Sequence, residues 1–388
     1  MTDQNVVQMG PPWRRYLHRG IEALRAGHPQ AALSDLERAH HSAPDEPDVL
    51  LALGRAKVSI EAFDEAAKLF ERALSLAPQS LAATALLARV LGLHLDRQQD
   101  ALTVLRDCSA PDAAPLQVVR GEILLEAGDI TAARTAFARA LDHDLSDDAA
   151  RTGLARTFNA EGIALSDRGA HEKAIFSFKR AADLDPGWSA PLVNQGVAFG
   201  RMGKLSKAAE AYGAALARDA QNPVAMFNLG VAHQELGSYS TAIDTLEELL
   251  AFCPNYPQGR ACLAACYLET GHFDRAIALL LEELDFNPAD ASCWSTLGSA
   301  YVFSGNAERG EQCLRRALGL DAKLVSAQLN LATLCATQGR AAEARKWLEE
   351  AMRLAPERTA QALKKAQHFS ALRGLLEPSA DATRPQLS

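Results

Sequence analysis

The chain has 388 residues, 48% of them hydrophobic and 23% charged, with a formal net charge of −8 and 7 cysteines. The apolar fraction is that of a folding chain, the acidity argues against nucleic acid as a partner, and no run of about 18 apolar residues predicts a membrane span. The N-terminal residues lack the apolar core of a secretory signal and the scattered cysteines are typical of reduced thiols, so we expect a soluble, cytoplasmic protein that does not insert into a membrane.

The first part of the chain repeats one helical pattern four times. After an N-terminus over residues 1–12 that we expect to be disordered, repeats 1–4 occupy residues 13–147, with copies that begin near residues 13, 47, 82 and 114. The third copy is degenerate, because "LHLDRQQDA" replaces the usual glycine turn.

Six further copies follow over residues 148–358, beginning at residues 155, 189, 223, 257, 291 and 325 in a register of 34. They are preceded by the extra residues "DAARTGL" (148–154), which would add about two helical turns. We therefore expect a lengthened helix at the start of the fifth copy. Whether this insertion is a local elongation or a functional hinge is left open.

Each of the six copies in register contains two apolar runs with helical spacing, separated by a glycine. These separating glycines are Gly169, Gly203, Gly237, Gly271, Gly305 and Gly339. A glycine at this point predicts a helix end that needs a positive φ. A second set of glycines, Gly196, Gly230 and Gly298, would let two antiparallel helices approach closely, and a bulky residue in the second run would fill the remaining gap. A hairpin of this kind covers its apolar face only with the next copy.

The copies resemble the tetratricopeptide repeat. One copy carries most of that repeat's consensus, at Trp294, Leu297, Gly298, Tyr301, Leu314 and Ala317. The resemblance implies an all-α fold, a right-handed α-solenoid of about ten antiparallel helix pairs.

After the last copy, a broad apolar face predicts a capping helix over residues 359–376, followed by a disordered tail over 377–388. The face comprises Leu363, Ala366, Phe369 and Leu372.

No motif predicts catalysis, a cofactor or a metal. "GVAFGRMGKL" is not a phosphate loop, because Ala198 occupies the first glycine position and Leu205 stands where a Ser or Thr would bind magnesium. Cys262 and Cys266 share a helix face, but a structural zinc needs four ligands, so packing is the better interpretation. We therefore do not expect an enzyme.

The resemblance implies that the first helix of each pair lines a concave groove. Two positions beyond the consensus aromatic, this groove row reads Asn194, Asn228, Cys262, Thr296 and Asn330, and Asn159 lies one position earlier in its own copy. An asparagine amide can pair with one peptide unit, and helices about 10 Å apart would present one amide to every third residue of an extended chain.

This row resembles in part the asparagine ladder in the repeat half of protein O-linked N-acetylglucosamine transferases. It is interrupted at Cys262 and Thr296, and no catalytic domain follows the repeats, so transferase activity is not expected. Asparagine before Leu-Gly is also common in the repeat consensus, and both interpretations stay open.

Other groove positions add apolar and charged side chains. We expect apolar contacts from Val193, Phe227 and Leu329, and charged contacts from Arg201, Glu235 and Glu269, with Arg55 and Arg156 as further candidates.

The sequence thus predicts a non-enzymatic scaffold or adaptor that binds other proteins, through extended segments or helices, in a concave groove. Two alternatives remain: a structural protein that self-assembles, and a regulatory subunit of a separately encoded enzyme.

Overall fold

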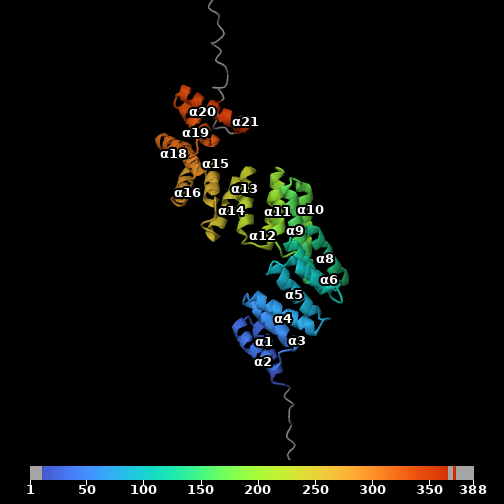
Figure 1. Cartoon of the computed structure of the whole chain (residues 1–388). Coiled ribbons are helices and arrows are strands. Elements are labelled where there is room, and N and C mark those ends of the chain that lie inside the picture. The colour runs from blue at the N-terminus through green and yellow to red at the C-terminus, as the bar shows by residue number, and fades with distance from the viewer. Residues whose placement is uncertain (1–10, 366–369, 373–388) are drawn as a thin grey trace, which may run out of the picture. The chain divides into compact units, whose positions relative to one another are not determined.

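The computed structural model describes residues 11–365 and 370–372, and these residues form 21 α-helices and no strand (Figure 1). The predicted all-α class is therefore confirmed. Of the segments predicted to be disordered, residues 1–10 and 377–388 lie outside the described residues. The prediction is wrong for Pro12, which begins the first helix after Pro11 at its N-cap. No helix among the described residues is both long and apolar enough to cross a membrane.

The chain divides into two compact units, Met1–Ala198 and Phe199–Ser388. The first unit contains α1 (Pro12–Arg25), α2 (Pro29–Ser42), α3 (Pro47–Ser59), α4 (Phe63–Leu76), α5 (Leu81–Leu93), α6 (Gln98–Asp107), α7 (Ala114–Glu126), α8 (Ile130–His143), α9 (Asp148–Asp167) and α10 (His171–Leu184). Helix α11 (Ala190–Arg201) crosses the division. The second unit contains α12 (Leu205–Arg218), α13 (Pro223–Glu235), α14 (Tyr239–Phe252), α15 (Gly259–Glu269), α16 (Phe273–Phe286), α17 (Ala291–Phe303), α18 (Ala307–Leu320), α19 (Val325–Thr337), α20 (Ala341–Leu354) and α21 (Pro356–Lys365).

Consecutive helices pack as hairpins in both units (Figure 1). In the second unit, α13, α15, α17 and α19 each pack against the following helix and against the first helix of the next pair, where one follows. In the first unit, α5, α7 and α9 are stacked in the same way. This is the layered arrangement of an α-solenoid, in which each hairpin is covered by its neighbours.

The glycine turns have the predicted backbone. All six separating glycines have a positive φ, between 70° at Gly203 and 89° at Gly305. At Gly237, the N–H of Ser238 donates to the carbonyl of His233 at 2.8 Å, which closes the last turn of α13. An L-residue pays a steric cost in this conformation, whereas glycine does not. In the degenerate third copy the positive φ falls on Asp96, at 55°.

Glycines inside the first helices allow the predicted close approach. A Cβ at Gly230 would lie 2.7 Å from Cγ of Leu246, and a Cβ at Gly298 would lie 2.7 Å from Cγ of Leu314. Both leucines are fully buried. The small residue and the bulky residue therefore fit together as one unit of hairpin packing.

A side chain near the start of a first helix fastens the preceding loop. Trp294 donates its indole N–H to the carbonyl of Pro288 at 2.9 Å. Two buried glutamines make the same contact: Gln328 donates to the carbonyl of Ala322 at 2.9 Å, and Gln117 donates to that of Pro111 at 2.8 Å. Each donor reaches six residues back, so an amide replaces the consensus indole in two copies.

The seven extra residues belong to one continuous helix. Helix α9 has 20 residues, and its first two turns contain residues 148–154. Asp147 accepts a hydrogen bond from the N–H of Ala150 at 3.0 Å and so caps the helix. Gly153 lies against the ring of Phe137, which also contacts Gly121. The insertion is thus packed onto the fourth hairpin.

The last described helix covers part of the final hairpin. Helix α21 begins at Pro356, packs against α20, and buries Leu363 against Leu329 and Leu348. Leu372 is fully buried in the same cluster. The other two positions of the predicted capping face, Ala366 and Phe369, lie outside the described residues.

Candidate functional site

Three hollows are lined mainly by first helices of the pairs, and within each unit we call the side of these hollows the inner face. The N-terminal hollow, of about 560 Å³, is formed by α1, α3 and α5. The middle hollow, of about 580 Å³, is formed mainly by α5, α7 and α9. The C-terminal hollow, of about 290 Å³, is formed by α17 and α19. The first two belong to the first unit and the third to the second unit.

The N-terminal hollow has an apolar floor and a charged rim. The floor consists of Leu17, Ile21, Leu24, Leu51, Ala52 and Leu86. The rim carries the exposed side chains of Arg25, Arg55 and Asp48. Arg55, one of the predicted groove cations, therefore lies at an inner-face hollow.

The middle hollow is walled by the insertion. Asp148, Ala149, Thr152 and Gly153 of the first two turns of α9 line it. Arg156 follows them on the same helix, and so also lies where the sequence predicted a groove residue. Across the hollow, Arg89 makes a two-pronged pair with Glu122, at 2.9 and 3.1 Å. A pair of this geometry fixes α5 against α7.

The C-terminal hollow is neutral. It is lined by Ser299, Val302, Phe303, Asn330, Thr333, Leu334 and Thr337. Asn330 donates its amide N–H to Oγ of Ser299 at 2.7 Å, and none of the described residues donates to its Oδ1. The Phe303 ring is 41% exposed. Apolar surface and free acceptor oxygens therefore share one hollow.

The predicted asparagines are all half-buried on first helices, two in each unit. Asn194 donates its amide N–H to Oδ1 of Asn159 at 2.9 Å within the first unit. Asn228 and Asn330 lie in the second unit, separated along the row by Cys262 and Thr296. The hydroxyl of Thr296 donates to the carbonyl of Ser292 at 3.0 Å in its own helix.

The three predicted apolar contacts face the packed interior. Val193 is 7% exposed and Leu329 is 2% exposed, the latter in the core cluster beneath α21. Phe227 is half-buried and packs against the ring of Tyr256, with centroids 5.1 Å apart. Val193 and Leu329 hold the inner helices in place, whereas Phe227 keeps part of its ring accessible and Phe303 is exposed.

The predicted charged residues end their helices. Arg201, Glu235 and Glu269 are the last residues of α11, α13 and α15, and all are exposed. Burial, followed by the negative charge of Glu235, raises the pKa of Tyr212 to about 12. Glu235 thus faces the preceding hairpin. The same row continues, at intervals of 34 residues, through Phe303 and Thr337. These two residues were not among the predicted groove residues, although the repeat register points to their positions.

The cysteines are packed thiols. Burial raises the pKa of Cys262 to about 11 and that of Cys266 to about 12, so both are protonated near neutral pH. A protonated thiol is a poor nucleophile and a poor metal ligand. Among the described residues, no group of three or more His, Cys, Asp or Glu side chains is arranged to hold a metal ion.

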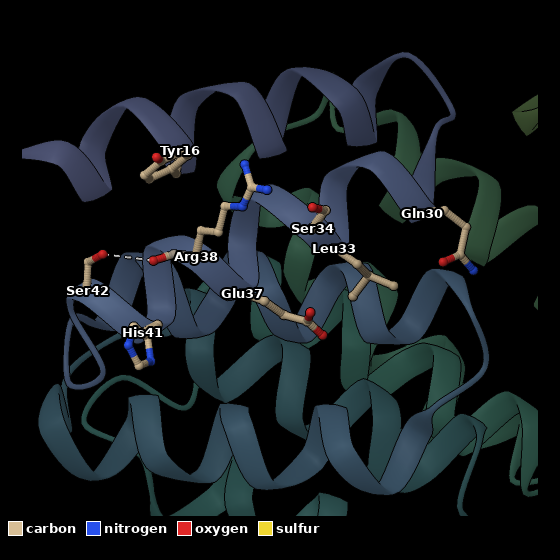
Figure 2. A pocket seen from close by; sticks show the side chains of 8 residues that line it. All are labelled: Tyr16, Gln30, Leu33, Ser34, Glu37, Arg38, His41 and Ser42. Carbon is tan, nitrogen blue, oxygen red and sulfur yellow. Dashed lines mark hydrogen bonds between the residues drawn. The ribbon is translucent and has the colours of Figure 1, made fainter.

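A fourth hollow, of about 660 Å³, lies along α2, with Tyr16 of α1 in its lining (Figure 2). The guanidinium of Arg38 lies 6.0 Å from the centroid of the Tyr16 ring, and the lining is mostly polar. Tyr16 is half-buried, so it does not provide a fully exposed aromatic side chain through which copies of the chain could associate.

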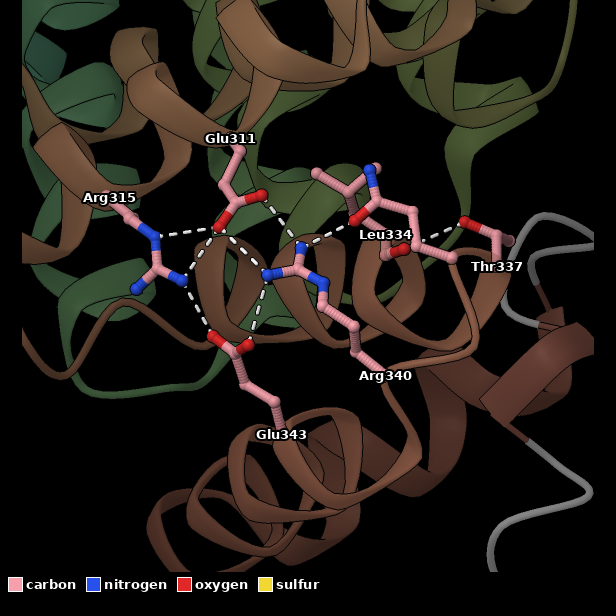
Figure 3. A network of polar contacts seen from close by, with 7 residues as sticks. Glu311, Arg315, Leu334, Thr337, Arg340 and Glu343 are labelled. Atoms are coloured by element: carbon pink, nitrogen blue, oxygen red, sulfur yellow. Dashed lines mark hydrogen bonds and ion pairs between the residues drawn. The ribbon is translucent and has the colours of Figure 1, made fainter.

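An ion-pair network joins the last two hairpins (Figure 3). Arg340 contacts Glu311 at 2.7 Å and Glu343 at 3.0 Å, and Arg315 contacts the same two carboxylates. The hydrogen bond from Arg340 lowers the pKa of Glu311, and that from Arg315 lowers the pKa of Glu343. Each carboxylate pairs with both arginines, so we interpret the network as one that holds the two hairpins together rather than as a binding site.

Sequence profiles of the tetratricopeptide repeat match the chain. One covers residues 118–187, 193–257 and 295–359, just over half of the chain, and another covers residues 23–90 and 237–300. No curated protein matches the chain in sequence.

Several solved structures are similar to the chain. The APC/C hetero-tetramer Cut9-Hcn1 contains a chain that is 14% identical, with a TM-score of 0.47, over 95% of this chain and 97% of that one. YrrB, described as a TPR protein with an unusual peptide-binding site, is 19% identical, with a TM-score of 0.43, over 50% and 96%. A tetratricopeptide repeat protein from Parabacteroides merdae ATCC 43184 is 15% identical, with a TM-score of 0.45, over 65% and 97%.

The profile matches coincide with the hairpins, the positive-φ glycines and the glycine–leucine packing described above. The chain belongs to the tetratricopeptide-repeat family.

Proposed function

We propose that this chain is a non-enzymatic scaffold that binds an extended segment of a partner protein against its inner face. Proteins of the tetratricopeptide-repeat family serve in general as scaffolds for protein–protein interaction, and the helical hairpins here provide such a surface. The single observation that carries the finer proposal is the composition of the C-terminal hollow. All seven cysteines are free thiols, which suits a partner met in the cytoplasm.

Each hydroxyl group of the C-terminal hollow donates its hydrogen bond to a backbone carbonyl of its own helix. Ser299 donates to the carbonyl of Ser295 at 3.2 Å, Thr333 to that of Leu329 at 2.8 Å, and Thr337 to that of Leu334 at 2.9 Å. The oxygens that remain are acceptors, as is Oδ1 of Asn330. Donors from the partner would satisfy them, and an extended backbone supplies an N–H at every residue.

The apolar part of the same hollow would receive a side chain of the partner. Phe303 stands at the end of α17, with its ring centroid 6.1 Å from that of Phe273. Half-buried Val302 lies beside it in the lining, and Leu334, which is buried, lies beneath. Concave sites that combine apolar lining with a few fixed polar groups are the common form of a binding pocket. In the proposed complex, Asn330 orients the backbone and Phe303 contacts a side chain.

The test begins with selection of peptides from a phage-displayed library of random sequences against the full-length chain. Selected peptides are synthesised with a fluorescein label, and their affinities are measured by fluorescence anisotropy. The test variant is Phe303→Ala with Asn330→Ala, and the matched control is Phe286→Ala with Asn255→Ala, which removes the same groups away from the inner-face hollows, at residues that are exposed. We expect the test variant to lose at least about tenfold in affinity, because two contacts of about 1 kcal/mol each are removed.

Light scattering over a concentration series completes the test. A chain that remains monomeric and binds peptides through the C-terminal hollow supports the proposal. Equal affinities in the test variant and the control, together with concentration-dependent association of the chain, would instead favour the self-assembling alternative.

A further inference from the structure

The N-terminal hollow differs from an ordinary solvated surface because its floor is apolar and contiguous. Leu17, Ile21 and Leu24 lie on one side of α1, and they pack on the core cluster formed with α2 and α3. Leu51 of α3 and Leu86 of α5 extend this floor across two further hairpins. All five side chains are half-buried, so each keeps apolar surface exposed to solvent.

The rim of this hollow is cationic in an acidic chain. Arg25 ends α1 and Arg55 lies in the middle of α3, and neither side chain forms an ion pair with any described residue. Elsewhere in the first unit, several arginines are paired, for example Arg19 with Asp35 at 3.0 Å and Arg72 with Asp45 at 2.9 Å. The position of Arg25 in the last turn of its helix also places a positive charge where the helix dipole favours it.

The carboxylate in the lining of this hollow does not neutralise the two arginines. Asp48, in the first turn of α3, is the one carboxylate among the described lining residues, and it makes no ion pair with either arginine. Two guanidinium groups against one carboxylate leave the lining with a net positive charge, although the chain as a whole has a net charge of −8.

We propose that the N-terminal hollow binds a partner segment that carries aliphatic side chains flanked by aspartate or glutamate. The aliphatic side chains cover the leucine and isoleucine floor, and the carboxylates pair with Arg25 and Arg55. The proposal deepens the proposed function, on which it rests, by naming the chemistry of the partner at a second inner-face hollow. Apolar contact supplies the larger part of the affinity, and the two arginines supply the selection for acidic sequences.

The charge of the rim decides between this occupant and others. A basic segment would place like charges beside both arginines, and a purely apolar segment would leave two guanidinium groups without partners next to a partly desolvated surface. An acidic, aliphatic segment avoids both penalties.

The probe is a phage-displayed library of random dodecapeptides, selected against the full-length chain. Clones are then divided by whether they bind the charge-reversed variant Arg25→Glu with Arg55→Glu. The matched control is Lys173→Glu with Lys179→Glu, which makes the same change at two exposed positions of α10 in the same unit. All four positions are exposed, and circular dichroism and thermal melting confirm that each variant is folded.

We expect a class of clones that carries Asp or Glu among Leu, Ile, Val or Met. Synthetic peptides of this class should bind R25E/R55E at least about tenfold more weakly than wild type and bind K173E/K179E unchanged, because reversal of each charge turns an attraction into a repulsion. Asp48→Asn should increase their affinity by a few fold, since it removes the one repulsive carboxylate.

Two other results would overturn the inference. The inference is contradicted if every selected peptide binds R25E/R55E as tightly as wild type, or if the peptides that R25E/R55E binds more weakly lack acidic residues; either result leaves the proposed function intact. If no peptide is selected against the wild-type chain at all, both the inference and the proposed function fail.

Discussion

The N-terminal and C-terminal hollows are built by the same kind of hairpin, yet they offer opposite chemistry. The N-terminal hollow joins a leucine and isoleucine floor to two arginines that pair with no carboxylate among the described residues. The C-terminal hollow is neutral, and its lining includes hydroxyls, an asparagine and a phenylalanine. The repeat consensus fixes the glycines and the buried leucines in both places. It leaves the inner-face positions free to vary, and the difference between the hollows lies there.

The largest expected effect comes from removing the leucine behind each hollow. Leu36 and Leu314 are fully buried and fill the gap opposite Gly20 and Gly298, respectively. Truncation to alanine should lower the free energy of unfolding by about 2–5 kcal/mol in each case. Leu314→Ala should impair peptide binding at the C-terminal hollow alone, and Leu36→Ala at the N-terminal hollow alone.

Thermal melting followed by circular dichroism measures the loss of stability, and anisotropy with one peptide selected for each hollow measures binding. Equal loss of both peptides in both variants would show that the two hollows do not behave as separate sites.

The second effect is the response to salt. Between about 0.1 M and about 1 M ionic strength, the screening length falls from about 10 Å to about 3 Å. Affinity at the N-terminal hollow should fall roughly five- to tenfold, because Arg25 and Arg55 contribute through charge. Affinity at the C-terminal hollow should change by less than about twofold. Anisotropy titrations in NaCl give both values, and a parallel decline at the two hollows would contradict the comparison.

The third effect isolates the asparagine in the neutral hollow. Asn330→Ala removes the hydrogen bond to Ser299 and the free Oδ1 acceptor, so affinity for a C-terminal peptide should fall about fivefold, near 1 kcal/mol. Asn194→Ala serves as the control, because its partner Asn159 lies in the first unit. If both variants lose the same affinity for the peptide of the C-terminal hollow, Asn330 does not contact that peptide in the way we propose.

The smallest effect concerns the ion-pair network of the second unit. Because hydrogen bonds from arginines depress the folded pKa of Glu311, its contribution to stability is present above the ordinary value of 4.5 and is lost as pH falls through the folded pKa. Glu311→Gln should therefore cost about 1 kcal/mol near pH 7 and progressively less below pH 4.5.

Urea unfolding at several pH values measures this difference, with the unpaired, exposed Glu349→Gln as control. A cost that stays constant down to pH 3 would contradict the ion-pair explanation.

The sequence predicted most of the fold because the 34-residue register places the turn glycines and the helix-packing residues at the same positions in successive copies. Gly237 and its counterparts predicted the positive-φ turns, and Gly230 with Leu246 predicted the close helix packing; the structure confirms both. The seven extra residues before the fifth copy predicted a first helix longer by about two turns, because one turn takes 3.6 residues. Helix α9, with 20 residues, is lengthened in this way.

The candidate site could be predicted only in part. Leu329 precedes Asn330, and one residue rotates a helical position by about 100°, so the neighbour of a groove residue can face the core. Phe303 and Thr337 lie in the row of Glu235 and Glu269 and could have been found by extending the register. The sequence could not predict that Arg25 and Arg55 lack ion-pair partners among the described residues, because this depends on distances between side chains of different hairpins.

The most direct test of inner-face binding is photo-crosslinking from two positions of the second unit. A photoreactive benzoylphenylalanine replaces either Phe303, 41% exposed at the C-terminal hollow, or Phe286, 67% exposed at the end of α16. The probe is a peptide that was selected against the full-length chain and that binds R25E/R55E as tightly as wild type. Our proposal predicts crosslinking from position 303 and little from position 286, despite the greater exposure of the latter. Crosslinking that is stronger from position 286, or that joins copies of the chain to one another, would contradict it.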